Sequence, residues 1–263
     1  MLEFFNEDRS QINESWLIKQ NLNAILGIRV VLLIIVHAIW WFQIYNGNLN
    51  FLFLLTNLKF LTIWGLNLLH FYLIFAVADM IYYKVKRVKF SVFWKLEHFL
   101  FQFGFATSLT ILILFWGCIY PTLKNKFTDD SWMMFVNVCY HGIIFIIYYI
   151  EFAINNIIFR RKQFILTAIG CLSYLIINII VTFSYGRVYP LMTWMNAISY
   201  LYALAAFIIT IFHFWLAMVL YNKYKLPSLS INFDHLSIPG SVIQLTNKDL
   251  PSDNDLIKNQ QKL

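Results

Sequence analysis

Long apolar runs alternate along the chain with short polar segments. Six of the runs can cross a bilayer as helices, because about 20 residues at ~1.5 Å each match a ~30 Å hydrocarbon core. They cover residues 24–44, 61–82, 98–120, 132–151, 164–184 and 193–221. The pattern predicts an all-α polytopic membrane bundle of six transmembrane helices at 24–221, between a polar lead-in at 1–23 and a polar C-terminal tail at 222–263.

The fourth run carries a stripe of polar side chains. At ~100° per residue, Asn137, His141, Tyr148 and Glu151 fall on one helix face, and Asn155 continues it. Lipid offers such a face no partners, so we expect it to face the bundle interior or a wet cavity. Interhelical hydrogen bonding is one explanation. Chemistry at His141 is the other, because imidazole both accepts and donates protons near neutral pH.

Composition supports the membrane interpretation and excludes several functions. The 263 residues are 60% hydrophobic and 13% charged, whereas about a quarter of a soluble domain is charged. The three cysteines lie inside apolar runs, and neither a CxxC pair nor a Cys/His metal spacing is present. We therefore expect reduced core cysteines, no metal and no cofactor.

Lysine and arginine are distributed unevenly between the two sides of the predicted bundle. Of the 20, sixteen fall on the side of both chain ends: three near the N-terminus, five in the second loop, three in the fourth loop and five in the tail. The positive-inside rule therefore places both termini in the cytoplasm or its organellar equivalent. Topology thus accounts for the net charge of +7, and no nucleic-acid partner is expected.

Thr62 is a second candidate for chemistry, because the range of depths possible for Thr62 includes the depth of His141. His141 lies roughly 14 Å below the outer end of its run, and Thr62 lies between ~5 Å and ~18 Å deep, depending on where the preceding turn meets the interface. A threonine hydroxyl beside a histidine can attack a carbonyl, while the histidine takes the proton and returns it to the leaving alkoxide. A threonine near a helix start is also often only a cap.

Three further residues are candidates for the surroundings of this pair. Asn137 lies one turn above His141, where it orients the imidazole or satisfies a backbone carbonyl. Tyr120 and Tyr189 each precede a proline at the same outer rim. We expect an acyl substrate with long chains to reach this region laterally from the bilayer.

Four ordered segments resemble the androgen-induced protein family. They are Lys59-Phe60-Leu61-Thr62, like that family's "WKFLT", the Asn137, His141 and Glu151 spacing, Ile119-Tyr120-Pro121, and Gly186 followed by Val188-Tyr189-Pro190. The resemblance covers about residues 24–221. It implies a six-span membrane enzyme that hydrolyses fatty acid esters of hydroxy fatty acids, with Thr62 as nucleophile and His141 as base.

The chain also departs from that family's pattern. Asn57 and Leu58 stand where the family usually has two glycines, Val138 replaces a histidine, and Ile143 and Ile144 replace hydroxyl residues. These changes leave the Thr–His pair but remove neighbours that could donate to an oxyanion.

Two other hypotheses follow from these departures and from the polar stripe. One is a non-catalytic membrane subunit of a larger complex, joined through the tail at 222–263. The other is a small-solute transporter, although no inverted repeat is visible. An endoplasmic reticulum or plasma membrane location is expected, with the mitochondrial inner membrane as the alternative.

Structural roles are expected for several remaining polar residues. Arg29, near the start of its run, is expected to snorkel to the surface. His37, His70 and His213 are expected to be interhelical partners. The tail at 222–263 has too few apolar residues to build a core, so the bundle is expected to fold without it.

The charge asymmetry predicts that tags at the two termini lie on the same side of the membrane. In sealed vesicles, protease should digest both tags or protect both. Exposure of one tag and protection of the other would require an odd number of spans.

Overall fold

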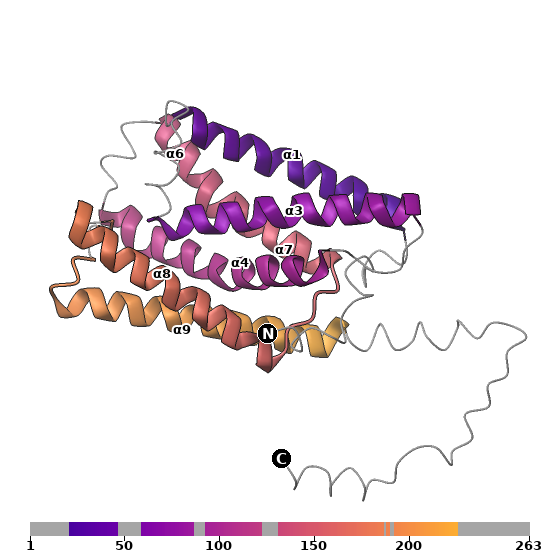
Figure 1. Cartoon of the computed structure of the whole chain (residues 1–263). Coiled ribbons are helices and arrows are strands. Elements are labelled where there is room, and N and C mark those ends of the chain that lie inside the picture. The colour runs from indigo at the N-terminus through magenta and orange to yellow at the C-terminus, as the bar shows by residue number, and fades with distance from the viewer. Residues whose placement is uncertain are drawn as a thin grey trace, which may run out of the picture. The chain divides into compact units, whose positions relative to one another are not determined.

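The computed structural model describes residues 21–46, 59–86, 93–122, 131–186, 188–189 and 192–225. Within these ranges the chain is helical and has no strand, and six helices are long and apolar enough to cross a membrane. The six predicted runs are thus confirmed as helices, and the bundle is drawn in Figure 1.

Three of the six helices contain a π-helical turn. The elements are α1 (Leu22–Asn46), α3 (Leu61–Lys86), α4 (Trp94–Leu114) followed by the π turn Phe115–Ile119, α6 (Ser131–Val138) and α7 (Ile144–Ile154) joined by the π turn Cys139–Ile143, α8 (Phe164–Tyr185) after the 3-10 turn Arg161–Gln163, and α9 (Ala197–Leu220) continued by the π turn Tyr221–Lys225. π turns inside α-helices occur frequently at functional sites.

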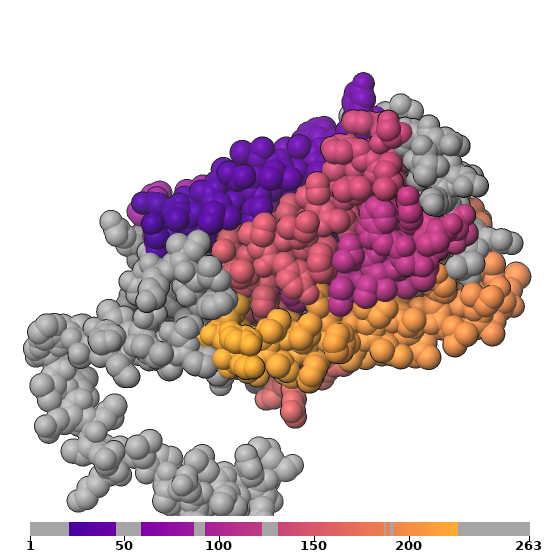
Figure 2. Space-filling model, turned by 180° about the vertical axis from the view of Figure 1, so that it is seen from behind, coloured from indigo at the N-terminus to yellow at the C-terminus, as the bar shows by residue number. Residues whose placement is uncertain are grey.

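Helix α4 forms the centre of the bundle. It contacts α3, α7, α8 and α9, and 14 of its 21 residues are buried, against 4 of the 22 residues of α8. The face seen from behind in Figure 2 is formed by α1, the α6–α7 helix, the end of α4, and α9. Large apolar side chains are exposed along α1, α8 and α9, which is compatible with helices that cross a membrane.

Helices α3, α4 and α7 approach closely around one tyrosine. The Tyr148 hydroxyl donates to the Gly65 carbonyl across 3.0 Å. On α4, a Cβ added at Gly104 would overlap that hydroxyl oxygen. Only glycine leaves room for the tyrosine there, so the inward face predicted for Tyr148 is used for packing and hydrogen bonding.

A buried ion pair joins α1 to α7. Arg29 Nε lies 3.3 Å from Glu151 Oε2, and both side chains are 0% exposed. The Tyr72 hydroxyl donates to the same carboxylate oxygen across 2.8 Å. The prediction that Arg29 snorkels to the surface is therefore wrong. Burial removes water from the Arg29 charge, and the Glu151 carboxylate on the facing helix compensates this cost.

The histidine predictions outside the candidate site are confirmed. His37 Nδ1 lies 3.0 Å from His70 Nε2, between α1 and α3. His213 Nε2 lies 2.8 Å from the Tyr149 hydroxyl, between α9 and α7. Each pair satisfies polar groups between helices.

The last helix differs from the predicted run at both ends. It begins at Ala197, where the Asn196 side chain accepts from the Ser199 amide across 3.0 Å. Upstream, Trp194 has a φ of 58°, and its amide donates to the Ser199 hydroxyl across 2.9 Å. An asparagine cap therefore starts the helix later than hydropathy alone predicts.

At its other end the helix continues past the predicted boundary at Tyr221. The Lys225 ammonium donates to the Asn155 carbonyl across 2.7 Å and also to the Phe152 carbonyl, at the end of α7. Lys225 also lies 3.9 Å from the centroid of the Phe152 ring. A cation at a helix C-terminus satisfies carbonyls that have no partner within the helix.

This contact predicts different results for two truncations of the tail. A chain that ends after Tyr221 loses Lys225 and leaves two buried carbonyls without a donor, which costs about 1–3 kcal/mol each. A chain that ends after Leu226 keeps that contact. In thermal unfolding of the detergent-solubilised protein, only the shorter chain should melt earlier than the full chain, and equal melting of the two truncations would contradict this role of Lys225.

Candidate functional site

Thr62 and His141 come together from two helices. Thr62 is the second residue of α3, and His141 lies in the π turn between α6 and α7. Thr62 Oγ1 is 3.4 Å from His141 Nδ1, a distance at the long end of hydrogen bonding. Thr62 is half-buried and His141 is buried. The structure thus brings together the two residues that sequence and depth had singled out.

A second π turn provides the ring that stacks on His141. Phe115 opens the π turn that follows α4, and its ring centroid lies 3.6 Å from that of His141, with 6° between the two planes. This parallel contact restricts the imidazole to one plane. In the described part of the chain, Thr62 is the side chain that hydrogen-bonds His141.

Two tyrosine hydroxyls hold the start of α3 beside the pair. The Tyr189 hydroxyl accepts from the Leu61 amide across 2.9 Å, and the Tyr174 hydroxyl donates to the Lys59 carbonyl across 2.9 Å. The two hydroxyl oxygens lie 3.1 Å apart. Because Tyr174 gives its proton to Lys59, Tyr189 is the donor between them. Burial raises the pKa of Tyr189, so its hydroxyl stays protonated at neutral pH.

Tyr174 is itself held by a short chain of donors. Asn178 Nδ2 donates to the Tyr174 hydroxyl across 3.3 Å, and Trp194 Nε1 donates to Asn178 Oδ1 across 2.9 Å. Sequence reasoning missed these residues. The signal was present as a second polar stripe at helical spacing, made of Thr167, Cys171, Tyr174, Asn178 and Thr182.

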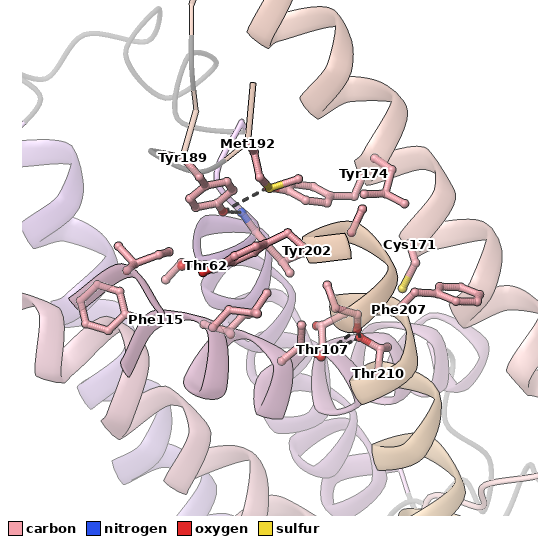
Figure 3. Close-up of a pocket in the computed structure, with 18 of the residues that line it drawn as sticks. Thr62, Thr107, Phe115, Cys171, Tyr174, Tyr189, Met192, Tyr202, Phe207 and Thr210 are labelled. Atoms are coloured by element: carbon pink, nitrogen blue, oxygen red, sulfur yellow. Dashed lines mark hydrogen bonds between the residues drawn. The ribbon is translucent and has the colours of Figure 1, made fainter. Parts of the chain in front are cut away.

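An apolar pocket with an empty volume of about 730 Å³, part of it open to the surroundings, adjoins the pair. Thr62, His141 and Tyr189 line it. Figure 3 shows Thr62 and Tyr189 toward one end of the pocket, and Thr210 and Phe207 toward the other. A hydroxyl and an imidazole at the wall of an apolar space suit a ligand with one reactive polar group and a long hydrocarbon part.

Two of the predicted surrounding residues do not line this pocket. Asn137 Nδ2 donates to the Met133 carbonyl of its own helix across 2.8 Å. Of the two roles open for Asn137, the backbone role is the one observed. Tyr120 packs near Phe115, with 6.4 Å between ring centroids, and lies outside the pocket lining.

The described departures from the family pattern also lie away from the pocket. Val138 is exposed, Ile144 is buried in the core, and Ile143 packs against that core. These three residues are outside the pocket lining. Asn57 and Leu58 fall outside the described residues. The described substitutions therefore do not form part of the pocket wall.

Across the described ranges, no three His, Cys, Asp or Glu residues are placed to hold an ion. The three cysteines are free thiols.

Comparisons with family models, curated proteins and solved structures find no match to this chain. The likeness to the androgen-induced protein family therefore rests on the four sequence segments. The contact between Thr62 and His141 is an independent geometric observation.

Because the Tyr189 hydroxyl holds the start of α3, its removal should lower the stability of the protein. Tyr189→Phe leaves the first amide of α3 without its acceptor, which should lower the free energy of unfolding by about 1–3 kcal/mol. Tyr185→Phe is the matched control, because Tyr185 is 84% exposed. Thermal unfolding in detergent measures both, and equal melting of the two variants would show that the hydroxyl does not hold α3.

Proposed function

We propose that this chain is an intramembrane lipid hydrolase, whose six helices cross the bilayer with both termini on the cytoplasmic side. The observation that carries the proposal is the 3.4 Å contact between Thr62 Oγ1 and His141 Nδ1 at the wall of an apolar pocket. Fatty acid esters of hydroxy fatty acids are the substrate class that the family resemblance implies. The endoplasmic reticulum or the plasma membrane is the proposed location.

The chemistry divides between the two residues. Neutral His141 accepts the hydroxyl proton at Nδ1 while Thr62 Oγ1 attacks the ester carbonyl. The alkoxide leaves with that proton, and an acyl group remains on Thr62. A water molecule then attacks the acyl carbonyl, gives one proton to His141 and releases the acid, and the proton returns to Thr62.

The start of α3 favours the developing negative charge. Thr62 lies in the first turn of the helix, at the positive end of the helix dipole; in this turn the Leu61 amide donates to Tyr189 and the Ile63 amide to the Phe60 carbonyl. The dipole stabilises an oxyanion when this end of the helix faces the reacting carbonyl. The Tyr189 hydroxyl, beside the same turn, keeps this end of the helix in place.

A non-catalytic membrane subunit is the second candidate function. The observation in its favour is the Phe115 ring, which covers one face of His141 at a 3.6 Å centroid distance. A ring packed this tightly is also what a filled structural core contains. Assembly partners reached through the tail would then replace substrate as the function of the chain.

The hydrolase proposal predicts that Thr62 and His141 act as a unit. Thr62→Ala and His141→Ala should each lower kcat for a long-chain ester by at least about a hundredfold. The double variant should be little worse than either single variant. Thr62→Ser, which keeps a hydroxyl, should retain part of the activity. Hydrolysis by purified protein in detergent or nanodiscs measures all four.

Asn137→Ala and Thr122→Ala are the controls, because neither residue lines the pocket. Both should keep full activity. Hydrolysis that survives Thr62→Ala would exclude the threonine nucleophile. A folded wild type without activity on any long-chain ester would favour the subunit function.

A further inference from the structure

One end of the pocket extends away from the Thr62–His141 pair, and we call this end the arm. Phe115 and Thr107 both line the pocket from the same helix, and their eight-residue separation is about 12 Å along the axis. The arm passes between α4, α8 and α9, where Ala203 and Ala206 contribute only methyl groups to the wall. Figure 3 shows Thr107 and Thr210 together toward this end.

Two threonines form a polar site in this apolar arm. Thr110 Oγ1 and Thr210 Oγ1 lie 2.7 Å apart, on α4 and α9. Thr210 Oγ1 also donates to the Ala206 carbonyl across 2.9 Å. Both side chains are buried, and both line the pocket.

Both hydroxyl protons of this threonine pair are already used in hydrogen bonds. Each threonine hydroxyl has one proton and two lone pairs. If Thr210 donates to Ala206, then Thr110 must donate to Thr210, and the pair has no proton left. If the direction reverses, Thr110 donates to the Ala206 carbonyl, 3.4 Å away, and the result is the same. The unused capacity of the pair consists of lone pairs alone.

The hydroxyl proton of Thr107 is also already used in a hydrogen bond. Its hydroxyl donates to the Phe103 carbonyl across 3.0 Å and lies 3.1 Å from the Gly104 carbonyl. The three threonines that line the arm therefore offer hydrogen-bond acceptors to a ligand and no donor.

A ligand group that hydrogen-bonds to these three threonines must be a donor. An ammonium group would need a counter-charge, and Asp and Glu residues are missing from the pocket lining. A ketone, an ester or an ether accepts only, and would face lone pairs. A neutral hydroxyl fits both the polarity and the apolar surroundings.

We propose that the Thr110–Thr210 pair is a specificity site for a hydroxyl group on the hydrocarbon chain of the ligand. The proposal rests on the hydrolase function, since it assigns the arm to the acyl chain of that substrate. Phe115 and Thr110 are five residues apart on one helix, so the hydroxyl lies about 7.5 Å along the arm from the level of the reacting carbonyl. The preferred chain therefore carries a free hydroxyl several carbons from the ester carbonyl.

Binding of matched fatty acids tests the site without any need for turnover. The probes are octadecanoic acid and its derivatives with a hydroxyl or a keto group on the same carbon, moved along the chain, in competition with a fluorescent fatty acid on the full-length protein. The hydroxy acid should bind about fivefold more tightly than the keto acid at the best position, as one neutral hydrogen bond allows. Equal affinities at every position would overturn the proposal.

Variants then locate the preference in the threonine pair. Thr110→Val and Thr210→Val should each bring the ratio of hydroxy to keto affinity toward one, and Thr210→Ser should keep it. Thr182→Val is the control, because Thr182 is buried on α8 outside the pocket lining. A ratio that persists in both valine variants would also overturn the proposal, and a variant that fails to fold leaves the wild-type ratio as the decisive measurement.

The two proposals fail in different ways. If the protein prefers the hydroxy acid but hydrolyses no ester, the arm is a lipid-binding site and the hydrolase function is wrong. If it hydrolyses esters with no preference between hydroxy and keto chains, the hydrolase function stands and the specificity site is wrong.

Discussion

The contact of Glu151 with Arg29 and Tyr72 sets the register on which the rest of the bundle depends. On α3, Thr62 precedes Tyr72 by ten residues, and on the α6–α7 helix His141 precedes Glu151 by ten. The two helices therefore meet at two rungs about 15 Å apart along their axes. One is the 2.8 Å bond from Tyr72 to Glu151, and the other is the 3.4 Å contact of Thr62 with His141. Because a buried charge pair tolerates little displacement, the polar rung constrains the reactive one.

The two ends of this ladder are built for different tasks. Around Glu151, Arg29 and Tyr72 supply charge and hydrogen bonds, and the Lys225 ammonium closes the end of α7. Around His141 the neighbours are an aromatic ring and an apolar pocket. The first environment fixes helices in place, while the second leaves room for a ligand. The charged end at Glu151 is rigid, and it supports the open apolar end at His141. A small bundle can in this way position Thr62 and His141 while space for a ligand remains between its helices.

Helix positions could be predicted from the sequence, whereas the partners of the polar residues could not. Hydropathy and length are local, so the six runs and the inward stripe at His141 were readable. Arg29 and Glu151 are 122 residues apart, and nothing local to Arg29 indicates a buried partner instead of the surface. The π turns that hold Phe115 and His141 have no compositional signature in the sequence. The polar stripe through Tyr174 could have been found in the sequence from the same helical spacing that identified the stripe at His141.

The surroundings of His141 also bear on how a proton could move there. In a Ser–His–Asp triad a carboxylate orients the imidazole and stabilises its positive charge. Here the Phe115 ring can orient the imidazole but supplies no counter-charge, and Glu151 lies one rung away. A full imidazolium in an apolar site is expensive. In the proposed reaction the proton therefore has to pass from Thr62 to the leaving oxygen with little time on His141. This requires the leaving oxygen to lie within reach of Nδ1 when attack begins, so the position of the alcohol part of the ester matters as much as that of the acyl chain.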